Sequence, residues 1–294
     1  MTSSESYARV NGLDICYETL GEPSGEPLLL VMGLGGPLIW WDDEFCRQLT
    51  SRGFWVIRYD NRDCGRSSRI EGAPRPRPLR SLLGDTRSAA YTLDDMAADA
   101  AGLLDHLGVA PAHVMGVSMG GMIAQTLAIR HPEHVRSLVS IMSTTGRRTV
   151  GWASPSVARL LLRTPPRDRT EYVERTVRML RRISSPAFPF DAERMRRRAE
   201  ATFDRGLNPV GTARQMVAIA ASGDRTEALG RVRAPALVVH GRHDPLIHVS
   251  GGIATSRALP DAELRVIEGM GHDLPRPLWP SLADDVERLA ARAA

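Results

Sequence analysis

Short apolar runs alternate with helix-like patterns over most of this 294-residue chain, and this alternation limits the folds available to it. The apolar runs lie at residues 27–33, 54–60, 113–118, 135–144, 235–244 and 262–272, with helical patterns at 42–53, 92–108, 119–132, 251–260 and 279–294. The run at 27–33 is continuously apolar, as expected for a strand that is buried on both faces of a parallel sheet. This order predicts an α/β fold with a doubly wound, mostly parallel sheet.

Residues 145–230 interrupt the alternation once. Strand patterns are absent there, and arginine-rich helical patterns replace them; Val173, Val177 and Leu180 fall on one helix face. The sequence therefore predicts a core domain of residues 1–144 and 231–294, with a helical cap (a lid) inserted at 145–230. An Asn-Gly pair at 11–12 predicts an additional N-terminal hairpin.

Ser118 lies in the sequence GVSMG, residues 116–120, which fits the pattern G-x-S-x-G. The pattern is weak alone, but here a predicted strand precedes it and a predicted helix follows it. A sharp strand-to-helix turn of this kind lifts a serine hydroxyl above the edge of the sheet, where it can act as a nucleophile. The alternative is a tight glycine-rich turn without chemistry.

A serine hydroxyl needs a base and an orienting acid, which in this strand order should follow it, acid first and histidine last. His272 ends the last predicted run, in a glycine-rich loop after its apolar part, and it is the candidate base. Asp244 ends the preceding run and is the candidate acid. Asp273 is the rival acid, although it adjoins the base.

Acyl transfer also needs two donors for the developing oxyanion. Met119, at the start of the helix after Ser118, and Leu34, in the glycine-rich loop after residues 27–33, are the candidates for the two backbone N–H groups. We expect an apolar substrate pocket that uses Leu34, Met119 and Trp41. The three possible metal ligands His240, His243 and Asp244 should diverge at the end of their strand, so we expect no metal and no cofactor.

The remaining features favour a small-molecule enzyme. The formal charge is only +4, every basic side chain is arginine, and the basic clusters at 75–80 and 194–200 resemble solvated surface, so no nucleic-acid partner is expected. Cys16, Cys46 and Cys64 form no disulfide or zinc pattern. A signal-peptide pattern and an uninterrupted membrane-length apolar run are both missing, which predicts a cytoplasmic protein without membrane insertion.

Taken in order, the stretches VMGLGG, RYDNRDCGRSS, GVSMGG, VVHGRHDPL and GMGHDLP resemble the α/β-hydrolase superfamily. Within it, the chain is similar to aclacinomycin methylesterases and related lipase-type carboxylesterases. The resemblance implies Ser118, Asp244 and His272 as a catalytic triad, Leu34 and Met119 as oxyanion donors, and a helical cap. A serine at position 118 separates the chain from haloalkane dehalogenases and epoxide hydrolases, which carry aspartate there.

We therefore expect a serine carboxylesterase that hydrolyses small-molecule esters through an acyl-enzyme. Its substrates would be small to medium esters or esters of bulky acids, methyl esters included. The same fold leaves three alternatives open: a C–C hydrolase, a perhydrolase, and a ligand receptor with slow turnover. The oligomeric state, including a homodimer, also stays open.

Overall fold

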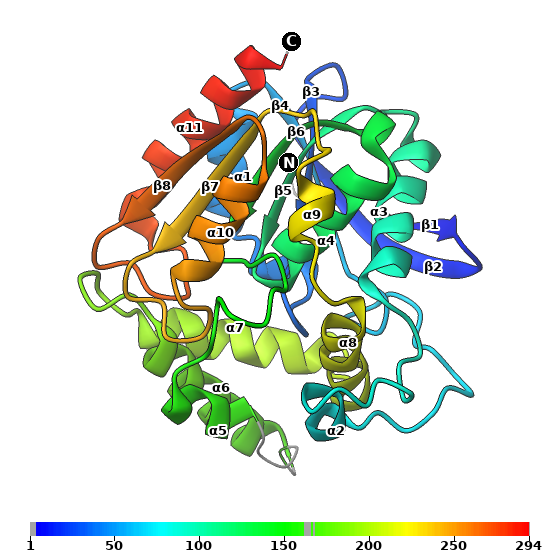
Figure 1. Cartoon of the computed structure of the whole chain (residues 1–294), viewed down its shortest axis with the longest axis vertical. Coiled ribbons are helices and arrows are strands. Elements are labelled where there is room, and N and C mark those ends of the chain that lie inside the picture. Colours follow the sequence, from blue (N-terminus) through cyan, green and yellow to red (C-terminus); the bar gives the residue numbers. More distant parts are fainter. Residues whose placement is uncertain (1–3, 162–165, 167, 294) are drawn as a thin grey trace.

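The computed structural model describes residues 4–161, 166 and 168–293. Within them, eight strands form one sheet in the order β1-β2-β4-β3-β5-β6-β7-β8 (Figure 1). The β1–β2 and β2–β4 pairs are antiparallel and the others are parallel, which confirms the predicted fold class. The strands are β1 (Ser6–Val10), β2 (Leu13–Leu20), β3 (Glu26–Val31), β4 (Phe54–Tyr59), β5 (Ala112–Val117), β6 (Val135–Ile141), β7 (Ala236–Gly241) and β8 (Ala262–Ile267).

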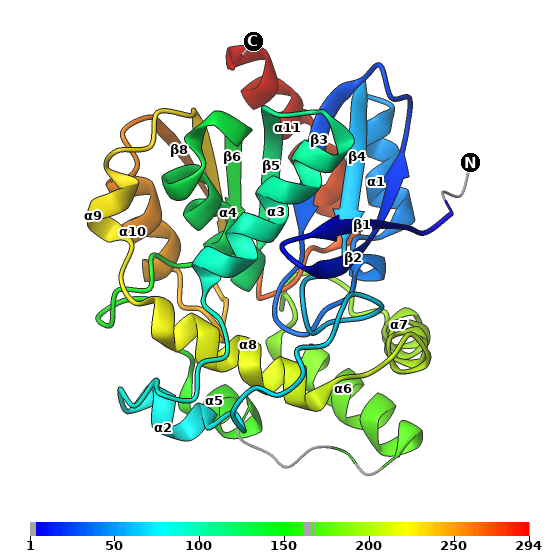
Figure 2. The same cartoon turned by 90° about the vertical axis from the view of Figure 1, so that its right-hand side faces the viewer.

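Helices cover both faces of the sheet, which explains why its central strands are apolar throughout. Helices α3 (Leu93–Leu107) and α4 (Met119–Arg130) pack on one face, with α10 (Ser250–Ala258) against β7 and β8. Helices α1 (Asp43–Thr50) and α11 (Trp279–Arg292) pack on the other face (Figure 2). All six residues of β5 are buried. Strand β5 therefore lies at the centre of the core, and packing on both faces of the sheet fixes the position of Ser118, the residue after it.

Between β6 and β7, the described residues form α5 (Pro155–Leu161), α6 (Arg169–Ile183), α7 (Ala192–Asp204), α8 (Pro209–Ser222) and α9 (Thr226–Leu229). Figures 1 and 2 show α5–α8 gathered at the end of the sheet to which the parallel strands point, whereas α9 returns to the sheet beside α10. The described part of residues 145–230 holds no strand, in line with the sequence pattern. The division into two domains stays a prediction.

Several sequence assignments need correction. The strands predicted at 135–144, 235–244 and 262–272 end earlier, at Ile141, Gly241 and Ile267. The strand predicted at 27–33 ends at Val31, and the next residues form a loop in which Met32 O accepts a hydrogen bond from Asn61 Nδ2 at 3.0 Å. The Pro- and Arg-rich stretch at 69–91, for which the sequence predicts no strand or helix, contains the short helix α2 (Pro78–Leu82). Proline at the first helical position, Pro78, is typical of a helix start. The other prolines nearby favour irregular structure, and they outweighed this pattern in the sequence.

Paired charges join the helical layer to the sheet. Arg205, directly after α7, donates to Asp60 Oδ2 at 2.8 Å, and the Asp60 side chain is 0% exposed. Arg194 and Arg198 of α7 both bond to Asp42, the residue that caps α1. Buried charges are tolerated only when they are paired, so these contacts hold α7 against the sheet edge.

The three cysteines are free and buried. Burial raises the pKa of the Cys16 and Cys46 thiols to about 12, so both are protonated at neutral pH. Within the described residues, no helix combines the length and apolar character needed to cross a membrane.

Candidate active site

Ser118 occupies a strained turn between β5 and α4. Its backbone has φ 57° and ψ −122°, in a region that side-chain-bearing residues rarely adopt. The close packing of the turn requires glycine on both sides of it. A Cβ atom on Gly116 would lie 2.1 Å from Gly120 O, and one on Gly120 would lie 2.0 Å from Val31 O. The local sequence thus bends the chain so that the serine hydroxyl stands at the carboxyl end of the sheet.

The structure brings Ser118, His272 and Asp244 into one hydrogen-bonded line. The His272 Nε2 atom lies 3.0 Å from Ser118 Oγ, and its Nδ1 atom lies 2.6 Å from Asp244 Oδ2. Asp244 follows β7 and His272 follows β8, so two neighbouring parallel strands deliver the acid and the base to the same edge. His272 is 9% exposed and Asp244 is 4% exposed. This is the geometry required of a nucleophile, a base and an orienting acid.

The Asp244 carboxylate is held from both oxygens. Its Oδ1 atom accepts the backbone N–H groups of Leu246 at 2.8 Å and Ile247 at 2.9 Å, which leaves Oδ2 facing His272. Burial by itself raises the pKa of this carboxyl, but the charge of His272 and the hydrogen bonds from His240, His272 and the Ile247 backbone outweigh it. The pKa of Asp244 therefore lies well below its usual range, and the group is a carboxylate at neutral pH.

The rival acid, Asp273, faces another element. Its Oδ1 atom accepts hydrogen bonds from the Ser185 hydroxyl and from the Ser185 backbone N–H, the latter at 2.9 Å. Ser185 Oγ in turn accepts the Gly271 N–H at 2.8 Å, and His272 N–H donates to Ile183 O at 2.7 Å. Asp273 thus anchors the loop that carries His272 to the residues after α6.

The two oxyanion candidates lie on either side of Ser118. Met119 is the first residue of α4, where a backbone N–H has no partner within the helix. Leu34 lies in the loop after β3, and a Cβ atom on the preceding Gly33 would be 3.1 Å from Ser118 Cβ. Among the hydrogen bonds of the described residues, the Leu34 N–H has no acceptor. Both amides therefore stay candidates for the two oxyanion donors.

A cavity of about 1070 Å³ opens between the sheet edge and the helical layer, and Ser118 and His272 line it. Its walls are mostly apolar, with Leu34, Met32, Met142 and Leu246 from the core side and Trp40, Leu79, Tyr172, Met179, Leu207 and Met216 around them. Arginines of α6 contribute the charged part of the lining. The volume slightly exceeds the usual range for ligand sites, about 300–1,000 Å³.

Two of the predicted substrate contacts are not in this lining. Trp41 is 1% exposed and stacks on Phe45 in the core beneath the sheet, whereas its neighbour Trp40 lines the cavity. Met119 is also 1% exposed, with its side chain in the core cluster on the α3–α4 face, so only its backbone can serve the site. Sequence reasoning missed the lining from α6, although Tyr172, Thr176 and Met179 share one face at i, i+4 and i+7.

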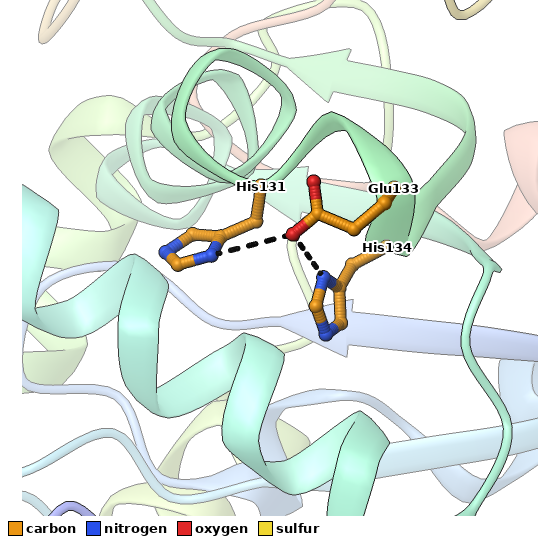
Figure 3. Close-up of side chains that lie close together, drawn as sticks. All are labelled: His131, Glu133 and His134. Atoms are coloured by element: carbon orange, nitrogen blue, oxygen red, sulfur yellow. Dashed lines mark hydrogen bonds and ion pairs between the residues drawn. The ribbon is translucent and has the colours of Figure 1, made fainter.

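The residues HGRHD at 240–244 do not converge as a metal site. His240 Nε2 lies 2.8 Å from Ile247 O and 3.5 Å from Asp244 Oδ2, so the predicted divergence of His240 from Asp244 is wrong. His243 points elsewhere, and its Nδ1 atom accepts the Gly269 N–H at 3.2 Å. In the described residues, one group of possible ligands does gather, on the turn after α4: His131, Glu133 and His134 (Figure 3). Both ring nitrogens of His134 already contact carboxylates, Glu133 at 3.0 Å and Asp105 at 2.9 Å, so hydrogen bonding accounts for this group.

Comparison with known proteins agrees with this architecture. The family model described as "alpha/beta hydrolase fold" matches residues 26–275. Rhodomycin D methylesterase DnrP of Streptomyces peucetius is 32% identical over 293 residues, covering 90% of this chain and 91% of that protein. Rhodomycin D methylesterase DauP of Streptomyces sp. strain C5 is 31% identical with the same coverage.

A solved structure gives the same fold. The meta-cleavage product hydrolase CumD of Pseudomonas fluorescens IP01 matches with a TM-score of 0.79 at 20% identity, covering 98% of each chain. At that identity the likeness is evidence of the fold alone. Because the family model spans most of the sequence and the methylesterases align over nine tenths of it, the chain belongs to the alpha/beta hydrolase fold family.

Proposed function

We propose that this protein is a carboxylic ester hydrolase in which Ser118, His272 and Asp244 form the catalytic triad. The observation that carries the proposal is the hydrogen-bonded line from Ser118 Oγ through His272 to Asp244 at the wall of the large cavity. The similarity to two methylesterases supports esters as the substrate class.

In the first half-reaction, Ser118 Oγ attacks the ester carbonyl carbon while His272 Nε2 takes its proton. The carbonyl oxygen becomes an oxyanion, which the N–H groups of Leu34 and Met119 stabilise. Asp244 holds the imidazole in the tautomer with Nδ1 protonated and stabilises the imidazolium. Collapse of the intermediate breaks the ester C–O bond, and the leaving alkoxide takes the proton from Nε2.

In the second half-reaction, water attacks the acyl-enzyme. His272 Nε2 accepts a proton from this water, and the resulting tetrahedral intermediate uses the same two N–H groups. Its collapse releases the carboxylic acid and returns the proton to Ser118 Oγ. The chemistry needs no metal and no cofactor, because the three side chains and two amides perform every proton transfer and charge stabilisation.

The similarity to two methylesterases favours an ester whose acid part is bulky and whose alcohol part is small, such as a methyl ester. A volume of about 1070 Å³ with mostly apolar walls suits a multi-ring acyl group. We propose further that residues 145–230 act as a cap domain on a core of residues 1–144 and 231–294, since α6 and α8 supply much of the cavity wall.

Hydrolysis of p-nitrophenyl acetate and of the methyl ester of a polycyclic aromatic acid tests the proposal. Ser118→Ala should abolish turnover of both, and a fluorophosphonate should label Ser118 and no other residue, as read by mass spectrometry. Ser140→Ala is the control, because Ser140 is a buried serine of the neighbouring strand β6 that bonds to Gln125 instead of the site. Full activity in Ser118→Ala, or no ester hydrolysis by the unmodified protein, would refute the assignment.

A further inference from the structure

A glutamine of the helical layer reaches the loop that carries one oxyanion donor. Gln215 of α8 is 0% exposed. Its Oε1 atom accepts the Gly35 N–H at 2.9 Å, and its Nε2 atom donates to Arg62 O at 2.9 Å. The two ends of one buried amide are thus bonded to two different loops at the carboxyl end of the sheet, the loop after β3 and the loop after β4. Figure 2 shows α8 running across this edge, below the carboxyl ends of the strands.

Two glycines let α8 come this close. Gly35 has φ 63°, which favours glycine, and a Cβ atom there would lie 2.8 Å from Thr212 Oγ1 on α8. A Cβ atom on Gly211, at the start of α8, would lie 2.3 Å from Asp63 O. Side chains at these positions would push the helix away and break the Gln215 contacts. The glycines therefore allow close contact between α8 and the backbone of the loops after β3 and β4.

The loop after β3 has three anchors in the described structure, and Gln215 is the middle one. Asn61 Nδ2 holds Met32 O at 3.0 Å on one side, and Asp60 Oδ1 accepts the Leu38 N–H at 2.6 Å on the other. The outer two anchors, Asn61 and Asp60, lie in the loop after the sheet strand β4, whereas Gln215 lies on the inserted helix α8. Gln215 fixes the peptide that joins Leu34 to Gly35, directly next to the free Leu34 N–H.

We propose that Gln215 is a positioning residue for the oxyanion site: it sets the direction of the Leu34 N–H, so that the site is complete only while α8 is seated. The inference rests on the proposed esterase function. It goes beyond that function because it makes the inserted helices part of the catalytic apparatus as well as of the cavity wall. Donors must lie within about 0.5 Å of their productive position to stabilise the transition state fully.

The test compares Gln215→Met with Gln125→Met. Both remove a wholly buried glutamine amide, but Gln125, on α4, donates to Ser140 Oγ at 3.1 Å and does not touch the loop. Gln215→Met should lower kcat by about tenfold or more and change KM by less than about threefold, because the lost interaction acts only in the transition state. It should also weaken inhibition by a trifluoromethyl ketone, which forms an oxyanion-like adduct with serine. Gln125→Met should keep kcat.

Hydrogen–deuterium exchange gives a readout that needs no turnover. Peptides covering residues 32–38 should exchange faster in Gln215→Met than in the unmodified protein, and at the unmodified rate in Gln125→Met. If Gln215→Met does not fold, Gln215→Asn takes its place, since it keeps the amide but is one methylene too short to reach Gly35. Unchanged exchange at 32–38, or equal loss of kcat in the Gln215 and Gln125 variants, would overturn the inference and leave the esterase function standing. Absence of ester hydrolysis in the unmodified protein with faster exchange at 32–38 would refute the function but not the role of Gln215 in holding the loop.

Discussion

Replacing Asp244 by asparagine should reverse the tautomer of His272. Two backbone N–H groups, those of Leu246 and Ile247, bond to Oδ1, so an asparagine would place its carbonyl oxygen there. Its NH2 group would then occupy the Oδ2 position, 2.6 Å from His272 Nδ1. Since an amide N–H must donate, Nδ1 would become the acceptor and the ring proton would move to Nε2, facing Ser118. The base could no longer accept the serine proton.

The expected loss follows from this geometry. Holding the wrong tautomer in a serine–histidine–aspartate site lowers kcat by about 10⁴, which corresponds to about 5.5 kcal/mol of transition-state stabilisation. Steady-state hydrolysis of p-nitrophenyl acetate measures it. Asp273→Asn is the matched control, because Asp273 is the neighbouring carboxyl but bonds to Ser185; its loss should be at least a hundredfold smaller. An Asp244→Asn variant within tenfold of the unmodified protein would refute the reasoning.

Three further outcomes follow from the structure. In urea unfolding, Ser118→Gly should be more stable than Ser118→Ala by up to about 2.5 kcal/mol. Glycine relieves the strain of φ 57°, about 1–3 kcal/mol, at an entropic cost of about 0.5–1 kcal/mol; a less stable glycine variant would contradict the strain. Burial raises the pKa of Asp42, but the contacts with Arg194, the Glu44 backbone and Arg198 outweigh it, so the pKa is lowered. The ionised Asp42 side chain therefore stabilises the fold above its unfolded pKa of about 4, and this stabilisation is lost as the pH falls further. The Tm difference between the unmodified protein and Asp42→Asn should therefore shrink below about pH 4, and a constant difference would count against it. Met216→Trp should narrow the cavity and lower turnover of a bulky-acid methyl ester by about tenfold or more while sparing p-nitrophenyl acetate; equal losses on both esters would speak against Met216 as a substrate contact.

Much of the site could be inferred from local sequence. The apolar strand before Ser118, the helix after it and the glycines around it form one continuous stretch of sequence, so the turn could be predicted locally. Asp244 and His272 each follow a strand, and parallel strands end at one sheet edge, so their meeting could be predicted from order alone. Trp41 shows the limit, because a one-residue difference in a short loop decides which of two tryptophans faces the cavity.

The sequence by itself determined the fold class, the chain order of the three candidate catalytic residues and the place of the helical segment between β6 and β7. These depend on local periodicity and on the geometry of strand-to-helix turns, which neighbouring residues specify. Only the tertiary structure decided which oxygen of Asp244 faces His272, which side chains of α6 and α8 enclose the cavity, and that Gln215 bonds to Gly35, 180 residues away along the chain. Such contacts depend on how separate elements pack, and no local pattern encodes the distance between a helix and a loop so far apart in sequence.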